Sequence, residues 1–100
     1  MAITKMLDLS TAHIRQETGD WLTNCSYHDT GDPIVYAKQD YGWFVYAYPD
    51  EEIPEEIPED LLKVIKYARK KKCIWIMLDG DAPDIKELPV YDWTEKGRLK

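Results

Sequence analysis

The clearest repeat of apolar positions lies just past the middle of the chain. Apolar side chains recur there at i, i+1, i+4 and i+7, namely Leu61, Leu62, Ile65 and Ala68. This spacing is typical of the buried stripe of an amphipathic helix. Pro58 suits the first helical turn, and Glu59 and Asp60 place negative charge beside its unsatisfied N–H groups. We predict a helix over residues 58–71.

A second helical pattern occurs earlier in the chain. Its members follow the spacing i, i+4, i+7, i+8 and i+11, and they are Ile14, Thr18, Trp21, Leu22 and Cys25. Gly19 within this pattern costs about 1 kcal/mol relative to alanine. The pattern still predicts a helix, with Arg15 at its start, where serine or threonine would be a better cap.

The remaining apolar runs have the patterns of strands. Residues 6–10 alternate apolar and polar side chains, and residues 73–79 form a continuous apolar run, so both segments are predicted to be central strands. Residues 34–48 contain two β-rich runs separated by residues 39–42. This arrangement predicts a hairpin.

The predicted order of elements is therefore β-α-β-β-α-β. Residues 88–93 can add a short final edge strand, because Pro89 cannot serve a central one. Two right-handed crossovers would place both helices on one face of an antiparallel or mixed sheet. The result is a two-layer α+β sandwich, ferredoxin-like or a close relative, with four or five strands. We expect a single domain over residues 1–100.

One face of this sheet has no helices, and aromatic side chains gather on it. Strand alternation divides the second half of the hairpin between the two faces. The side chains directed at the helices are Trp43, Val45 and Ala47. The side chains on the open face are Phe44, Tyr46, Tyr48 and, from across the hairpin, Tyr36. This aromatic row is our main candidate for binding a partner.

Two alternatives would cover the aromatic row, since large exposed apolar patches are uncommon on monomers. One is a second copy of the chain in a homodimer. The other is the C-terminal segment, which would fold back through Leu88, Val90, Tyr91 and Trp93.

The formal net charge of −6 comes from one segment. Residues 50–60 hold seven of the 19 acids, which leaves 12 acids against 13 bases elsewhere. Pro54 and Pro58 stiffen this segment into an extended connection. Charge runs are usually solvated, which favours a crossover loop. The alternative is a recognition segment that adds four partner-binding residues, Glu51, Glu52, Glu55 and Glu56.

Nothing in the chain predicts export or a membrane span. The longest apolar run, residues 73–78, is far shorter than the roughly 20 residues of a membrane-spanning helix. The N-terminal residues lack the apolar core and cleavage site of a signal peptide. We therefore expect a cytoplasmic protein in which Cys25 and Cys73 are free thiols.

Three stretches of the chain resemble a known group of proteins. They are LDLSTAHI (residues 7–14), DYGWFVY (residues 40–46) and LPVYDW (residues 88–93). They are similar to an uncharacterised family of small bacterial proteins found on plasmids, phages and other mobile elements. The resemblance implies a mobile-element context and transfers no catalytic residue.

Two groups of side chains near the first helix could carry chemistry. His13 follows a predicted strand, where a catalytic base could lie, but a lone histidine there is more often structural. Cys25 and His28 form a C-x2-H pair that could hold zinc together with His13. No second closely spaced pair supports a zinc site. We expect no catalytic residue, metal or cofactor here.

The aspartates after the last strand offer a different chemistry. Asp79, Asp81 and Asp84 could hold Mg²⁺ for reactions on phosphate esters or nucleic acid. Asp-Gly is also ordinary turn chemistry, which we favour. A metal-dependent enzyme that uses Asp79 and Asp81 is therefore the alternative rather than the main hypothesis.

We predict a small noncatalytic protein-binding module, monomeric or homodimeric. It would use the aromatic row and the acidic loop, which is the acid-rich segment of residues 50–60. Aromatic side chains on an open sheet could also stack nucleic-acid bases. The net charge of −6 and the lack of a basic face argue against that function. A further alternative is an acidic inhibitor of a nucleic-acid-binding host protein.

Overall fold

The computed structural model describes residues 3–28, 34–37 and 42–91. Its strands are β1 (Met6–Ser10), β2 (Val35–Ala37), β3 (Gly42–Tyr46) and β4 (Trp75–Asp79). Its helices are α1 (Gln16–His28) and α2 (Glu59–Lys70), with short 3-10 turns at η1 (Thr11–His13) and η2 (Asp50–Glu52). The predicted order β-α-β-β-α-β is confirmed, and α2 is shorter than predicted by one residue at each end.

The strands form one mixed sheet in the order β1-β4-β3-β2. β4 lies inside the sheet, parallel to β1 and antiparallel to β3, and β2 forms the predicted antiparallel hairpin with β3. Residues 38–41 of the hairpin connection lie outside the described residues. β1 is an edge strand, so the prediction of a central position for residues 6–10 is wrong. Its alternating pattern suits a strand with one solvated face.

The two helical connections are of different kinds. β1 and β2 run parallel with β4 and β3 between them, so α1 belongs to a split β-α-β unit that spans the sheet. α2 connects β3 to β4, which are antiparallel neighbours. The predicted second crossover between parallel strands is therefore wrong. The fold is α+β, with a four-stranded mixed sheet and two helices.

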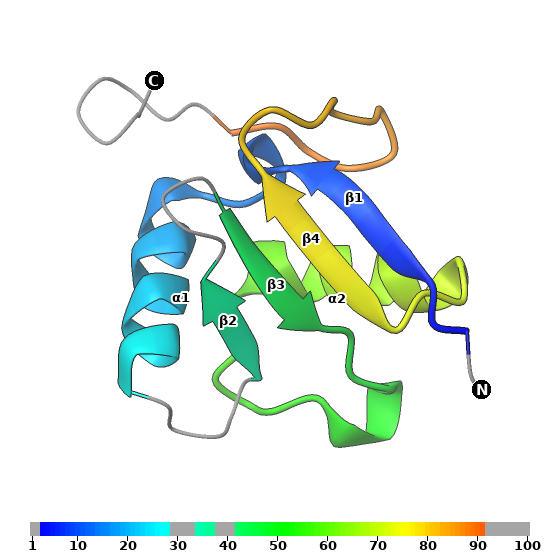
Figure 1. Ribbon diagram of the computed structural model, residues 1–100, viewed down its shortest axis with the longest axis horizontal. Coiled ribbons are helices and arrows are strands. Elements are labelled where there is room, and N and C mark those ends of the chain that lie inside the picture. The colour runs from blue at the N-terminus through cyan, green and yellow to red at the C-terminus, as the bar shows by residue number, and fades with distance from the viewer. Residues whose placement is uncertain (1–2, 29–33, 38–41, 92–100) are drawn as a thin grey trace.

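Both helices cover the same face of the sheet, as predicted (Figure 1). The buried stripe of α2 supplies Leu61, Val64, Ile65 and Ala68 to the core. The sheet residues that meet the helices are fully or almost fully buried, and they include Leu9, Val45, Ile76 and Leu78. The opposite sheet face has no helix on it among the described residues, and Figure 1 looks onto that face.

One buried carboxylate joins the N-termini of the two helices. Asp60, in the first turn of α2, is only 3% exposed. Its Oδ2 accepts the backbone N–H of Arg15 at 2.6 Å, and the Thr18 hydroxyl lies 2.7 and 2.9 Å from its two oxygens. Asp60 therefore fixes the residue before α1 and the first turn of that helix to the start of α2. Its hydrogen bonds serve α1, whereas the sequence had predicted a role at the start of its own helix.

The segment after β4 docks on η1 and adds no fifth strand within its described part. The Nε2 of the buried His13 accepts the backbone N–H of Ile85 at 3.0 Å, and its Nδ1 donates to the carbonyl of Pro89 at 2.8 Å. The N–H of Tyr91 donates to the carbonyl of Ala12. The predicted strand over residues 88–93 is wrong as far as residue 91, because these groups bond η1 rather than a sheet edge.

Candidate functional site

Strand alternation brings large side chains from all four strands to the face that the helices leave open. In one row across the sheet Met6 pairs with Trp75, and Trp75 pairs with Tyr46. The next row consists of Asp8, Met77, Phe44 and Tyr36. We define the aromatic sheet face as Met6, Tyr36, Phe44, Tyr46 and Trp75. Tyr36 is 60% exposed, Met6 is 45% exposed and the other three are half-buried.

The aromatic sheet face contains a depression of about 230 Å³, lined by Met6, Tyr36, Phe44 and Trp75. The ring centroids of Tyr36 and Trp75 lie 6.1 Å apart, with their planes tilted by 39°. Tyr46 meets Trp75 at 5.6 Å and 67°. Aromatic pairs with this separation and tilt attract each other beyond simple burial. The rings therefore hold one another in place around an apolar hollow.

Three of the four aromatic residues predicted for the open face are on it, namely Tyr36, Phe44 and Tyr46. Tyr48 packs edge-on against Tyr46, with ring centroids 4.9 Å apart, but it is only 5% exposed. Its hydroxyl accepts the backbone N–H of Ile34 at 2.9 Å. β3 ends at Tyr46, so strand alternation does not extend to Tyr48. The expectation that Tyr48 is exposed is therefore wrong.

Sequence reasoning missed two members of the aromatic sheet face, Met6 and Trp75. The continuous apolar run that contains Trp75 predicts a central strand and does not show which of its side chains face outward. In the structure Ile76 and Leu78 are fully buried, whereas Trp75 and Met77 are half-buried on the open face. The residue types could have indicated which side chains face outward, because Trp75 and Met77 alternate there with the aliphatic Ile76 and Leu78.

The C-terminal segment does not cover the aromatic sheet face through its described residues. Leu88 is buried in the core on the helical side, and Tyr91 packs beneath the guanidinium of Arg15. Val90 is 55% exposed. Trp93, the remaining residue of that hypothesis, lies outside the described residues.

The acidic loop is fixed by apolar side chains and directs its glutamates outward. Ile57 is buried in the core, and the half-buried Ile53 packs against it. All four predicted partner-binding glutamates are exposed, namely Glu51, Glu52, Glu55 and Glu56. Burial raises the pKa of the Cys25 thiol, and the charge of Glu56 raises this pKa further. Glu56 thus lies near α1, and the structure does not gather all four glutamates beside the aromatic rings.

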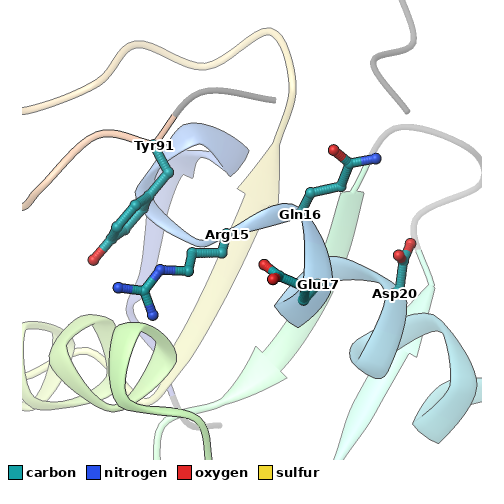
Figure 2. A pocket seen from close by; sticks show the side chains of 5 residues that line it. All are labelled: Arg15, Gln16, Glu17, Asp20 and Tyr91. Atoms are coloured by element: carbon teal, nitrogen blue, oxygen red, sulfur yellow. The ribbon is translucent and has the colours of Figure 1, made fainter. Parts of the chain in front are cut away.

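A second hollow, of about 400 Å³, lies at the start of α1. It is lined by Arg15, Gln16, Glu17, Asp20 and Tyr91. The guanidinium carbon of Arg15 lies 4.8 Å from the centroid of the Tyr91 ring. Figure 2 shows this pair on one side of the hollow and Asp20 on the other. The lining mixes both signs of charge, so it selects no single class of ligand.

Two of the candidate catalytic and metal-binding residues, His13 and Asp79, have hydrogen-bond partners in the backbone. Both ring nitrogens of His13 are engaged by backbone groups of the C-terminal segment. Asp79 accepts the backbone N–H of Asp81 at 2.9 Å, which confirms the predicted turn. Within residues 3–28, 34–37 and 42–91, no group of three potential metal ligands is found. Cys25 and Cys73 are free thiols.

The fold and the exposed face define a small α+β domain with an aromatic sheet surface. The chain belongs to a family of unknown function, described as the DUF5983 C-terminal domain, which matches residues 6–93. The three stretches that suggested an uncharacterised family all overlap these residues. Neither the curated proteins nor the solved structures give a match. Among the described residues, no helix has the length and apolar character needed to cross a membrane.

Proposed function

We propose that this domain is a noncatalytic protein-binding module whose contact surface is the aromatic sheet face. The observation that carries the proposal is the exposure of Tyr36 and Met6 beside three half-buried aromatic rings on a face with no helix. Aromatic residues dominate the energy of protein interfaces, because they bury a large area at a small entropic cost. The exposed glutamates of the acidic loop would add long-range attraction to a basic partner.

Binding to nucleic acid is less well supported by the same face. Base stacking on a sheet needs neighbouring basic side chains to neutralise the phosphates. The only charged residues in the four strands are Asp8 and Asp79. Phosphate groups would be repelled by both, so we favour a protein partner.

Affinity capture with matched variants tests the proposal. Tyr36→Thr combined with Phe44→Thr removes two rings and retains residues that favour strands. We expect this double variant to lose partners that the wild-type domain captures from a lysate of its source cells. The control is Lys63→Gln combined with Lys66→Gln, two exposed positions on α2. Thermal unfolding of all three proteins shows whether each remains folded.

Two results would contradict the proposal. One is retention of every captured partner by a folded Tyr36→Thr, Phe44→Thr variant. The other is loss of the same partners in the α2 control, which would move the contact surface to the helical layer. Tyr48 is left unchanged in these variants because it is buried, and its truncation would disturb folding.

One observation favours a more specific version of this function, inhibition of a nucleic-acid-binding protein. Such proteins carry basic surfaces, and the charged residues of the four strands are all acidic. A competition assay with DNA or RNA tests this version. The domain should displace nucleic acid from a captured partner, and simultaneous binding of both would rule out inhibition at the shared surface.

Three finer proposals accompany this function. We propose a cytoplasmic location and, from the resemblance of its motifs, a mobile-element context. We also propose a distant relation to the ferredoxin-like arrangement, because the order of elements is the same.

A further inference from the structure

The charges on the strands and the exposed basic charges on α2 lie on opposite sides of the sheet. Asp8 is exposed on the open face, in the same row as Phe44 and Tyr36. Asp79 lies one row further along, beside Gly42. No strand residue among those described carries a positive charge. Among the described strand residues, the open face therefore combines aromatic rings with carboxylates and carries no basic group.

The exposed lysines of α2 lie on the other side of the sheet. Lys63, Lys66 and Lys70 are exposed on α2, which lies behind the sheet when the open face is viewed (Figure 1). Lys5 is adjacent to Met6 but bonds the carbonyl of Lys71, just past the end of α2, at 3.3 Å. The Nζ of Lys71 lies 5.5 Å from the Tyr67 ring centroid, also on the helical layer. Lys5 and Lys71 are thus both engaged in contacts at the end of α2.

A face with this composition is suited to a cation. The ring faces of tryptophan, tyrosine and phenylalanine attract a positive charge, and arginine is the commonest protein group in such contacts. The depression lined by Met6, Tyr36, Phe44 and Trp75 offers three rings to one inserted side chain. Asp8 has no ion-pair partner among the described residues, so its carboxylate is available to a basic group nearby.

We infer that the partner presents a basic segment to the aromatic sheet face, with an arginine side chain seated over Trp75, Phe44 and Tyr36 and a second basic group near Asp8. This inference rests on the proposed function and specifies the chemistry of the partner. The net charge of −6 also favours a basic partner, because it increases the rate of association with one.

Titration with synthetic peptides tests the inference. The probe is a short peptide of alternating arginine and glycine, and its matched control replaces each arginine with citrulline, which has a similar shape but no charge. Calorimetry at low ionic strength measures both affinities. We expect the arginine peptide to bind. The citrulline peptide should bind at least about fivefold more weakly, because it cannot form the cation–π contacts and is not attracted to Asp8.

Variants locate the bound peptide on the domain. Trp75→Leu should weaken binding of the arginine peptide about two- to fivefold, the range expected for an exposed cation–π contact. Asp8→Asn should weaken binding about two- to fivefold and reduce its salt dependence. Asp84→Asn, at an exposed position on the segment after β4, is the matched control and should bind like the wild type. Asp8 is exposed, so its variant should fold even if Trp75→Leu does not.

Several outcomes would overturn the inference. Equal binding of the arginine and citrulline peptides would show that charge is not recognised, and unchanged binding by Asp8→Asn would place any arginine site elsewhere. Sedimentation that shows a dimer broken by Tyr36→Thr and Phe44→Thr would identify a second copy as the occupant. If both peptides bind equally, or if Asp8→Asn binds unchanged, only the inference about a basic partner is wrong. Affinity capture with the Tyr36→Thr, Phe44→Thr variant still tests whether the aromatic sheet face binds a protein.

Discussion

At the scale of single residues, buried polar side chains make the most specific contributions to this fold. His13 and Asp60 are both buried, and each connects segments that lie far apart in the chain. Backbone N–H groups can only donate, so the Nε2 of His13 must accept from Ile85 and its proton must lie on Nδ1. This histidine therefore has a structural role.

Substitutions at Asp60 and Glu59 separate the contribution of a buried carboxylate from that of an exposed one. Asp60→Asn should lower the free energy of unfolding by about 1 to 3 kcal/mol, because it disturbs the hydrogen bonds to Arg15 and Thr18. Glu59→Gln, at an exposed position in the same turn, should change it by less than about 0.5 kcal/mol. Urea denaturation measures both, and equal effects would contradict this assignment.

The reactivity of Cys25 tests its environment. The pKa of this thiol is raised by burial and by the charge of Glu56, so less thiolate is present at any given pH. Alkylation of Cys25 at mildly alkaline pH should therefore be slower than that of a cysteine in an unfolded peptide. Glu56→Gln removes one of the two causes and should increase the rate.

Glu52→Gln is the matched control for the Cys25 experiment, because Glu52 is exposed in the same loop and has no such effect on the thiol. Mass spectrometry of the Cys25 peptide follows the reaction. A rate that is unchanged by Glu56→Gln would show that this glutamate lies too far from the thiol to affect it.

At the scale of elements, the acidic loop between β3 and α2 has an apolar side and a charged side. Ile57→Ala should destabilise the domain by about 2 to 4 kcal/mol, since Ile57 belongs to the core. Replacing Glu51, Glu52, Glu55 and Glu56 together by glutamine should change stability by less than about 0.5 kcal/mol, because all four are exposed.

Thermal and urea denaturation measure both loop variants. A large loss of stability in the four-glutamine variant would mean that the loop depends on its charges to hold its shape. The same variant should bind a basic partner more slowly and with weaker salt dependence.

The sequence predicted the elements more reliably than their arrangement. The spacing of Leu61, Ile65 and Ala68 determines a helix locally, and alternation correctly assigned Phe44 and Tyr46 to the open face. The edge position of β1 depends on a pairing with β4 that no local pattern encodes. The C-terminal strand prediction failed for a similar reason, since the contacts of His13 with Ile85 and Pro89 span more than 70 residues.

At the scale of the whole molecule, β4 pairs with one strand that is near to it in the sequence and with another that is far from it. Tyr46 of β3 pairs with Trp75 of β4, but Met6 of β1 pairs with that same Trp75 across 69 residues of chain. Closing the longer loop costs more conformational entropy. We therefore expect β3, α2 and β4 to assemble first and β1 to join afterwards.

Stopped-flow kinetics tests this order of assembly. Leu9→Ala in β1 should chiefly accelerate unfolding, whereas Ile76→Ala in β4 should chiefly slow refolding. Both residues are almost fully buried, so each variant should lose about 2 to 5 kcal/mol of stability, enough for a reliable comparison. Slower refolding of Leu9→Ala in proportion to its loss of stability would place β1 in the folding nucleus.

The strands and α2 also place charges of opposite sign on opposite sides of the sheet. Asp8 and Asp79 are the charged residues of the strands, and the exposed lysines of α2 lie behind the sheet. A basic surface attracts the first group and repels the second before any atoms touch. These local charges would therefore favour approach of a basic partner from the side of the aromatic rings.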